Sequence, residues 1–168
     1  MHPNILKALI RNAFCNIRFP EHCGINAANA RDRWVSDARV LRRLTRKYDY
    51  RGPWWKVPDE HLENSLGFNY LDPKGVEFYL PALMILAIDQ PSYGTLTFLG
   101  WELNPARHED EINTYNYFKW RLSRIQGAKK EACLAFLNYL AGALRVFSTE
   151  EATAVQQALE HPFWRKAS

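Results

Sequence analysis

Apolar side chains recur along most of the chain at spacings of three and four residues, the period of a helix with one buried face. The most regular stretch runs from Ala128 to Phe147, and weaker ones lie near residues 5–17, 112–122 and 152–159. The stripe of the most regular stretch consists of Cys133, Phe136, Leu137, Leu140, Leu144 and Phe147. This pattern predicts an all-α fold, a single-domain orthogonal bundle of six to seven helices.

The middle of the chain, Pro73 to Asp89, is apolar on every side rather than on one face. Between Lys74 and Asp89, Glu77 is the only charged side chain. It is shorter than the roughly 20 residues that cross a bilayer, so we expect a buried central helix. Asp72 and Pro73 are typical of a helix start. Pro81 lacks the N–H that would bond the Glu77 carbonyl, which predicts a bend or a break near Leu80.

A second helix is predicted from Ala27 to Lys47. Its buried stripe would consist of Trp34, Ala38, Leu41, Thr45 and Tyr48. The opposite face gathers positive charge, with Arg42 at its edge: Arg39, Arg42, Arg43, Arg46 and Lys47. Residues 31–51 hold eight basic against three acidic side chains, an excess of five, whereas the whole chain has a net charge of only +4. This helix therefore carries the largest charge asymmetry in the sequence.

Three other segments have informative patterns, and two of them have more than one interpretation. Trp54 and Trp55 lie in a proline-rich loop, where they could stack on a ligand or cover the edge of the core; burial is the more common use of such side chains. Residues 95–103 fit a strand or a short helix, and helical spacing fits better. Ser148 followed by Glu151 matches a capping box, so a helix should end near Phe147 and another should begin there.

Residue types that could support chemistry occur in two clusters. Cys15, His22 and Cys23 could bind zinc, but a fourth ligand and the usual two-residue gap are absent. His108 is followed by three acids up to Glu111, which could bind a cation; adjacent residues cannot all face one point, and a solvated helix start explains them better. No nucleophile-elbow, phosphate-loop or dinucleotide-binding motif is present. We therefore predict no catalytic residue, metal or cofactor, while an enzyme of unknown reaction stays an open alternative.

Length and composition set the remaining limits. A chain of 168 residues with 47% apolar residues fits one self-sufficient domain covering residues 1–168. Three cysteines without framework spacing suit a reducing cytoplasm, and neither a secretory signal nor a membrane span is evident. We therefore expect a cytoplasmic protein that does not insert into membranes.

Four segments together resemble the bacterial domain-of-unknown-function family 6714: PWWKVPDEHL, FNYLDPKGVEFYLPALM, LSRIQGAKKEACLAFLNYL and ALEHPFW. The resemblance covers about the last two thirds of the chain and is most specific between Leu71 and Leu83. The matching positions are mostly apolar and look like fold determinants: Trp55, Leu71, Phe78, Tyr79, Leu80, Pro81, Phe136 and Leu137. The resemblance implies no known reaction or cofactor. Small bacterial proteins of this kind sometimes neutralise a toxin, so an immunity function is implied by association only.

Two functions of different classes follow from the basic residues Arg39, Arg42, Arg43, Arg46 and Lys47. The first is a non-enzymatic protein-binding module that docks an acidic surface, such as that of a cognate toxin. The alternative is nucleic-acid binding by the same helix, residues 31–47, through salt-sensitive phosphate contacts. A protein partner is favoured because the net charge is low for a nucleic-acid-binding domain and no recognised motif accompanies the basic residues.

Overall fold

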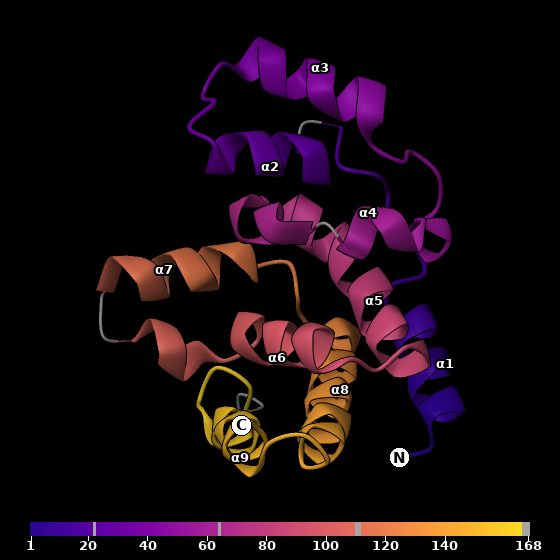
Figure 1. Ribbon diagram of the computed structural model, residues 1–168, viewed down its shortest axis with the longest axis vertical. Coiled ribbons are helices and arrows are strands. Elements are labelled where there is room, and N and C mark those ends of the chain that lie inside the picture. The colour runs from indigo at the N-terminus through magenta and orange to yellow at the C-terminus, as the bar shows by residue number, and fades with distance from the viewer. Residues whose placement is uncertain (22, 64, 110–111, 166–168) are drawn as a thin grey trace. The chain divides into compact units, whose positions relative to one another are not determined.

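The computed structural model describes residues 1–21, 23–63, 65–109 and 112–165, and every regular element in these ranges is a helix (Figure 1). The all-α prediction is therefore confirmed. The described α-helices are α1 Pro3–Ala13, α2 Ile25–Asp32, α3 Ala38–Tyr48, α4 Asp59–Glu63, α5 Pro73–Asp89, α6 Tyr93–Glu102, α7 Ile112–Arg121, α8 Ala128–Leu144 and α9 Thr149–Glu160. Three short 3₁₀ helices accompany them: η1 Trp54–Lys56, η2 Ser65–Tyr70 and η3 Pro105–His108.

The structure describes nine α-helices, more than the six to seven predicted. The main reason is that the second predicted helix is divided into α2 and α3. The stretch from Ala27 to Lys47 is interrupted after Asp32, and α3 begins anew at Ala38. Asp37 caps the new helix, since its carboxylate accepts the backbone N–H of Arg39 at 2.7 Å and that of Val40 at 3.3 Å. The predicted stripe is therefore wrong at Trp34, Ala38 and Tyr48, whose side chains are exposed, and right at Leu41 and Thr45.

Helix α5 is buried along most of its length, which confirms the predicted burial. Asp72 accepts the backbone N–H of Gly75 at 2.8 Å, which is the expected cap. The helix runs unbroken through Pro81, so a break there is wrong, while a bend stays a prediction. Glu77 is buried inside this apolar helix, and its carboxylate pairs with Arg124 at 2.5 Å. No helix in the described part of the chain is both long and apolar enough to cross a membrane.

The chain divides into two compact units, and the single domain predicted for residues 1–168 stays a prediction. One unit comprises residues Phe14–Leu83 and Arg121–Arg124. In it α2 packs between α3 and η2, as Figure 1 shows for α2 and α3. Its core contains Trp54, which is 1% exposed and donates its indole N–H to the carbonyl of Phe14 at 2.8 Å. Trp54 is therefore part of the core. Trp55 is half exposed, and its ring makes an edge-to-face contact with that of Trp54.

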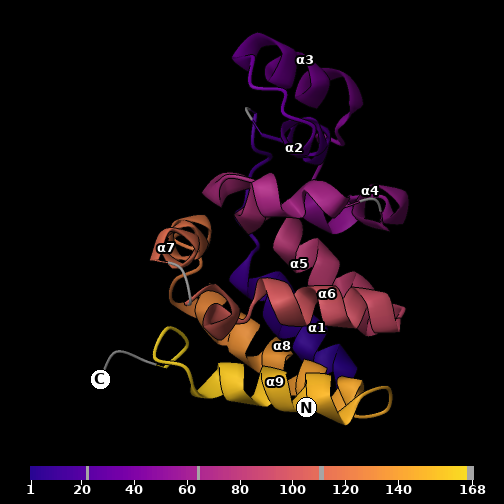
Figure 2. The ribbon, with the colours of Figure 1, turned by 60° about the vertical axis from the view of Figure 1, so that its left-hand side comes forward.

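The other unit comprises Met1–Ala13, Met84–Trp120 and Ile125–Ser168. Here α8 packs against α1, α6 and α9, and Figure 2 shows α1, α8 and α9 together. Residues 95–103 are almost entirely within helix α6, and Ser148 caps α9 through the N–H of Glu151, so both predictions are confirmed. Trp164 is fully buried and donates its indole N–H to the carbonyl of Leu103 at 2.8 Å, which docks the tail.

Apolar residues at the ends of the predicted stripes in this unit are exposed, namely Ile5 in the stretch 5–17, Ile112 in the stretch 112–122 and Phe147 in the stretch 128–147. Phe147 is 51% exposed because α8 ends at Leu144, and the side chain falls in the turn that follows. Ile112 is 76% exposed at the first position of α7. The remaining stripe of α8 is buried as predicted: Cys133, Phe136, Leu137, Leu140 and Leu144.

Candidate binding surface

The five basic residues singled out in the sequence all lie on one side of α3, and all five side chains are exposed. Their spacing of three, one, three and one residues places them within one face of a helix. Among the described residues, these five alone line one open hollow of about 510 Å³: Arg39, Arg42, Arg43, Arg46 and Lys47. We call this set the basic face.

The opposite side of α3 is fixed to the N-terminus of α2 by buried polar contacts. Gly24, the residue before α2, has no side chain to cap the helix, so other elements supply the acceptors. Thr45 accepts the N–H of Gly24 at 3.1 Å, Tyr79 accepts that of Ile25 at 3.4 Å, and Asp49 accepts that of Asn26 at 3.0 Å. Thr45 lies in α3 and Asp49 directly follows it, so their two contacts turn this side of α3 toward α2, whereas Tyr79 comes from α5.

Asp49 is the buried carboxylate of this arrangement. Its side chain is buried, its Oδ1 also accepts the side-chain N–H of Asn26 at 2.8 Å, and its Oδ2 has no hydrogen-bond partner among the described residues. A Cβ at Gly24 would lie 1.9 Å from that Oδ2, so only glycine fits beside it. Burial raises the pKa of Asp49, and the hydrogen bonds from Asn26 oppose this shift.

The charges of the basic face repel one another. Arg39 and Arg43, Arg42 and Arg46, and Arg43 and Lys47 are like-charge pairs four residues apart, each destabilising the helix by roughly 0.2–0.5 kcal/mol. No carboxylate in the described part of the chain forms an ion pair with any of them. The hydrogen bond and positive charge of Lys47 lower the pKa of the exposed Tyr48 phenol. The basic face therefore presents a positive field that nothing described in this chain neutralises.

Trp34 lies at the edge of this surface, in the turn Arg33–Asp37 that joins α2 to α3. Its backbone φ is +64°, and it is the one non-glycine residue with positive φ among those described. The N–H of Trp34 bonds the carbonyl of Arg31 at 2.9 Å and that of Val35 bonds the carbonyl of Ala30 at 3.0 Å, which together form a Schellman motif. Glycine is the usual residue at this position, since a side chain there costs about 1–2 kcal/mol.

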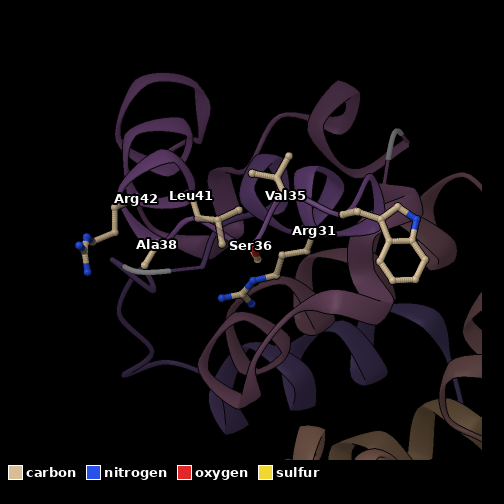
Figure 3. A pocket seen from close by; sticks show the side chains of 7 residues that line it. Arg31, Val35, Ser36, Ala38, Leu41 and Arg42 are labelled. Atoms are coloured by element: carbon tan, nitrogen blue, oxygen red, sulfur yellow. The ribbon is translucent and has the colours of Figure 1, made fainter.

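The indole of Trp34 is 93% exposed, the most of any large apolar side chain described. A second open hollow, of about 450 Å³, lies beside it and is shown in Figure 3. Arg31 comes from α2, whereas Leu41 and Arg42 come from α3. The residues lining it are Arg31, Trp34, Val35, Ser36, Ala38, Leu41 and Arg42. Arg42 lines both hollows, so they are neighbours on one surface.

Sequence reasoning found the basic face but missed Trp34. Periodicity placed this residue in a buried stripe because the spacing of three and four residues continues from Trp34 through Ala38 and Leu41. The signal that could have revealed the turn is Ser36-Asp37, since Asp37 is a strong N-cap directly before a helical run.

The other candidate sites are not assembled in the described residues. His22 lies outside them, and so do Asp110 and Glu111. His108 stacks on Phe118 with ring centroids 4.8 Å apart. Glu109 accepts a hydrogen bond from His161 at 2.7 Å, consistent with the N–H of Phe163 bonding the other ring nitrogen at 3.0 Å. No group of three potential metal ligands occurs in the part of the chain that the structure describes.

The model of one protein family, a family of unknown function called DUF6714, matches residues 3–168. The match extends through the first 50 residues, which the sequence motifs alone did not connect to the family. Comparison with curated proteins and with solved structures found no match.

Proposed function

We propose that this chain, a member of the DUF6714 family, is a cytoplasmic binding protein that docks an acidic protein partner on the basic face of α3. The observation that supports this most directly is the gathering of five exposed cations around one hollow with no carboxylate of the described chain paired to them. Clustered charge of one sign speeds encounter with an oppositely charged partner and fixes its orientation. Three free thiols support a reducing compartment.

The energetics of the surface support the same conclusion. The like-charge pairs of α3 and the backbone of Trp34 each destabilise the fold, and they lie on adjoining hollows. Costs of this kind persist where a surface is used for something other than stability. Tryptophan and arginine are also the residue types that contribute most to binding at protein interfaces.

The experiment is zero-length carbodiimide cross-linking in cells of the source organism, which joins an amine to a carboxylate in direct contact. We expect a partner whose aspartate or glutamate is linked to Lys47. Arg43→Glu with Arg46→Glu should abolish the linked product, whereas Arg11→Glu with Arg18→Glu should retain it. The second pair changes net charge equally at exposed positions outside α3 and serves as the matched control. Equal yield from both double variants would rule out the basic face as the docking surface.

An immunity protein is the more specific form of this proposal. Neutralising a toxin requires only that its active surface be covered, so a docking face without catalytic groups suffices. If the cross-linked partner is a toxin, co-expression of this chain should restore growth of cells producing it, and Arg43→Glu with Arg46→Glu should not. Growth arrest in the presence of the unaltered chain would contradict the immunity function but not the docking.

Nucleic-acid binding is the second candidate, and the exposure of Trp34 beside arginines favours it because bases stack on aromatic rings. It predicts a gel shift with single-stranded oligonucleotides whose affinity falls steeply with salt. A shift that survives Arg43→Glu with Arg46→Glu would exclude this helix as the nucleic-acid site.

A further inference from the structure

The hollow beside Trp34 differs in chemistry from the basic face. Its lining combines apolar side chains, Trp34, Val35, Ala38 and Leu41, with the guanidinium groups of Arg31 and Arg42. Its volume of about 450 Å³ has room for a single side chain, and it is open to solvent on one side. An occupant therefore needs an apolar group and a negative charge close together.

We propose that this hollow is an anchor site for an apolar side chain carried within an acidic segment of the partner protein. The inference rests on the proposed docking function and specifies what the partner must contain. A leucine-sized side chain would pack against the apolar side chains of this lining. Flanking carboxylates would meet the guanidinium groups of Arg31 and Arg42, which are labelled in Figure 3.

Two of the lining groups are held in place before any partner arrives. The guanidinium of Arg31 donates from Nη1 to the carbonyl of Tyr70 at 3.2 Å and to the sulfur of Cys23 at 3.1 Å. The Schellman hydrogen bonds fix the backbone that carries Trp34. Groups fixed in advance lose less conformational freedom on binding, so this geometry increases affinity without new contacts.

The lining also favours a peptide over a nucleic acid. Three of the four apolar residues are aliphatic, and one exposed indole offers a single stacking surface. Aliphatic walls suit an aliphatic side chain, whereas bases bind most strongly to successive aromatic platforms. Arg42 lines both hollows, which lets one acidic segment occupy the anchor site and the basic face together.

The test uses two labelled peptides of equal charge and about eight residues, which when extended at ~3.3 Å per residue span α3. Both consist of glutamates with two central substitutions, leucines in one and serines in the other. Fluorescence anisotropy should show that the leucine peptide binds about tenfold more tightly than the serine peptide. Burying one aliphatic side chain increases affinity by roughly a factor of ten. Trp34→Ala should remove this preference and leave the affinity for the serine peptide unchanged.

The controls separate this inference from the proposed function. Trp120→Ala removes another half-exposed tryptophan and should keep the leucine preference. Arg43→Glu with Arg46→Glu should weaken binding of both peptides, whereas Arg11→Glu with Arg18→Glu should not. A leucine preference that survives Trp34→Ala would overturn the anchor site alone. Equal binding of the serine peptide by the two double variants would overturn the docking function. An oligothymidine of equal charge is the last probe. If it binds more tightly than the leucine peptide and Trp34→Ala weakens its binding, the occupant of the hollow is a nucleic acid and the peptide proposal is overturned.

Discussion

Replacing Trp34 separates the cost of its backbone from the contribution of its ring. The indole is 93% exposed, so Trp34→Ala removes almost no buried apolar surface and should change the free energy of unfolding by less than about 0.5 kcal/mol. Alanine keeps a Cβ at φ +64° and therefore keeps the strain. Trp34→Gly removes that strain of about 1–2 kcal/mol and adds roughly 0.5–1 kcal/mol of unfolded-state entropy. The glycine variant should therefore be more stable than the alanine variant by about 1 kcal/mol.

Urea unfolding followed by far-ultraviolet circular dichroism measures this difference without relying on tryptophan fluorescence. For a chain of this size about 1 kcal/mol corresponds to a shift of roughly 2–4 °C in the midpoint of thermal unfolding. Trp54→Ala is the contrasting control, because the Trp54 side chain is buried and its loss should cost about 3–5 kcal/mol. A glycine variant no more stable than the alanine variant would refute the strained turn, and a large loss in Trp34→Ala would refute the exposed ring.

Three further predictions concern contacts of the unit that carries α3, with one control substitution in α8. Gly24→Ala places a Cβ 1.9 Å from the Asp49 carboxylate and should destabilise the fold by about 1–3 kcal/mol in urea unfolding, while Gly142→Ala, with nothing within 4 Å, should stabilise α8 by about 0.5–1 kcal/mol. Glu77 and Arg124 should show a coupling of about 1–3 kcal/mol in a double-mutant cycle with Glu77→Gln and Arg124→Ala, and additive effects would contradict the ion pair. Because burial raises the pKa of Asp49 from its usual 3.8, its carboxyl favours the fold most when protonated, at low pH, and this contribution is lost as pH rises above that value. Asp49→Asn should therefore gain stability relative to the unaltered chain between pH 4 and pH 7, and a difference independent of pH would contradict the assignment.

The parts of the fold that sequence predicts well are those where local chemistry and packing agree. Asp72 and Pro73 specify the start of α5, Ser148 specifies that of α9, and the structure has both. Pro81 is a counterexample, because burial of α5 keeps the helix continuous although one backbone N–H is missing. Caps are local and can be read from a few residues, whereas the tolerance of a helix for an internal proline depends on what packs around it.

The same distinction explains why the basic face was predictable and the hollow beside Trp34 was not. Five cations at helical spacing have to face solvent, since burying unpaired charges is prohibitively costly, and this holds wherever the helix begins. All five lie within α3, so the break at residues 33–37 leaves their common face intact. Trp34 lies within that break, so whether its side chain is buried or exposed depends on the conformation of the turn. In a continuous helix the Trp34 ring would follow Leu41 and Thr45 into the core. Because a left-handed residue ends α2, the same ring is exposed to solvent instead.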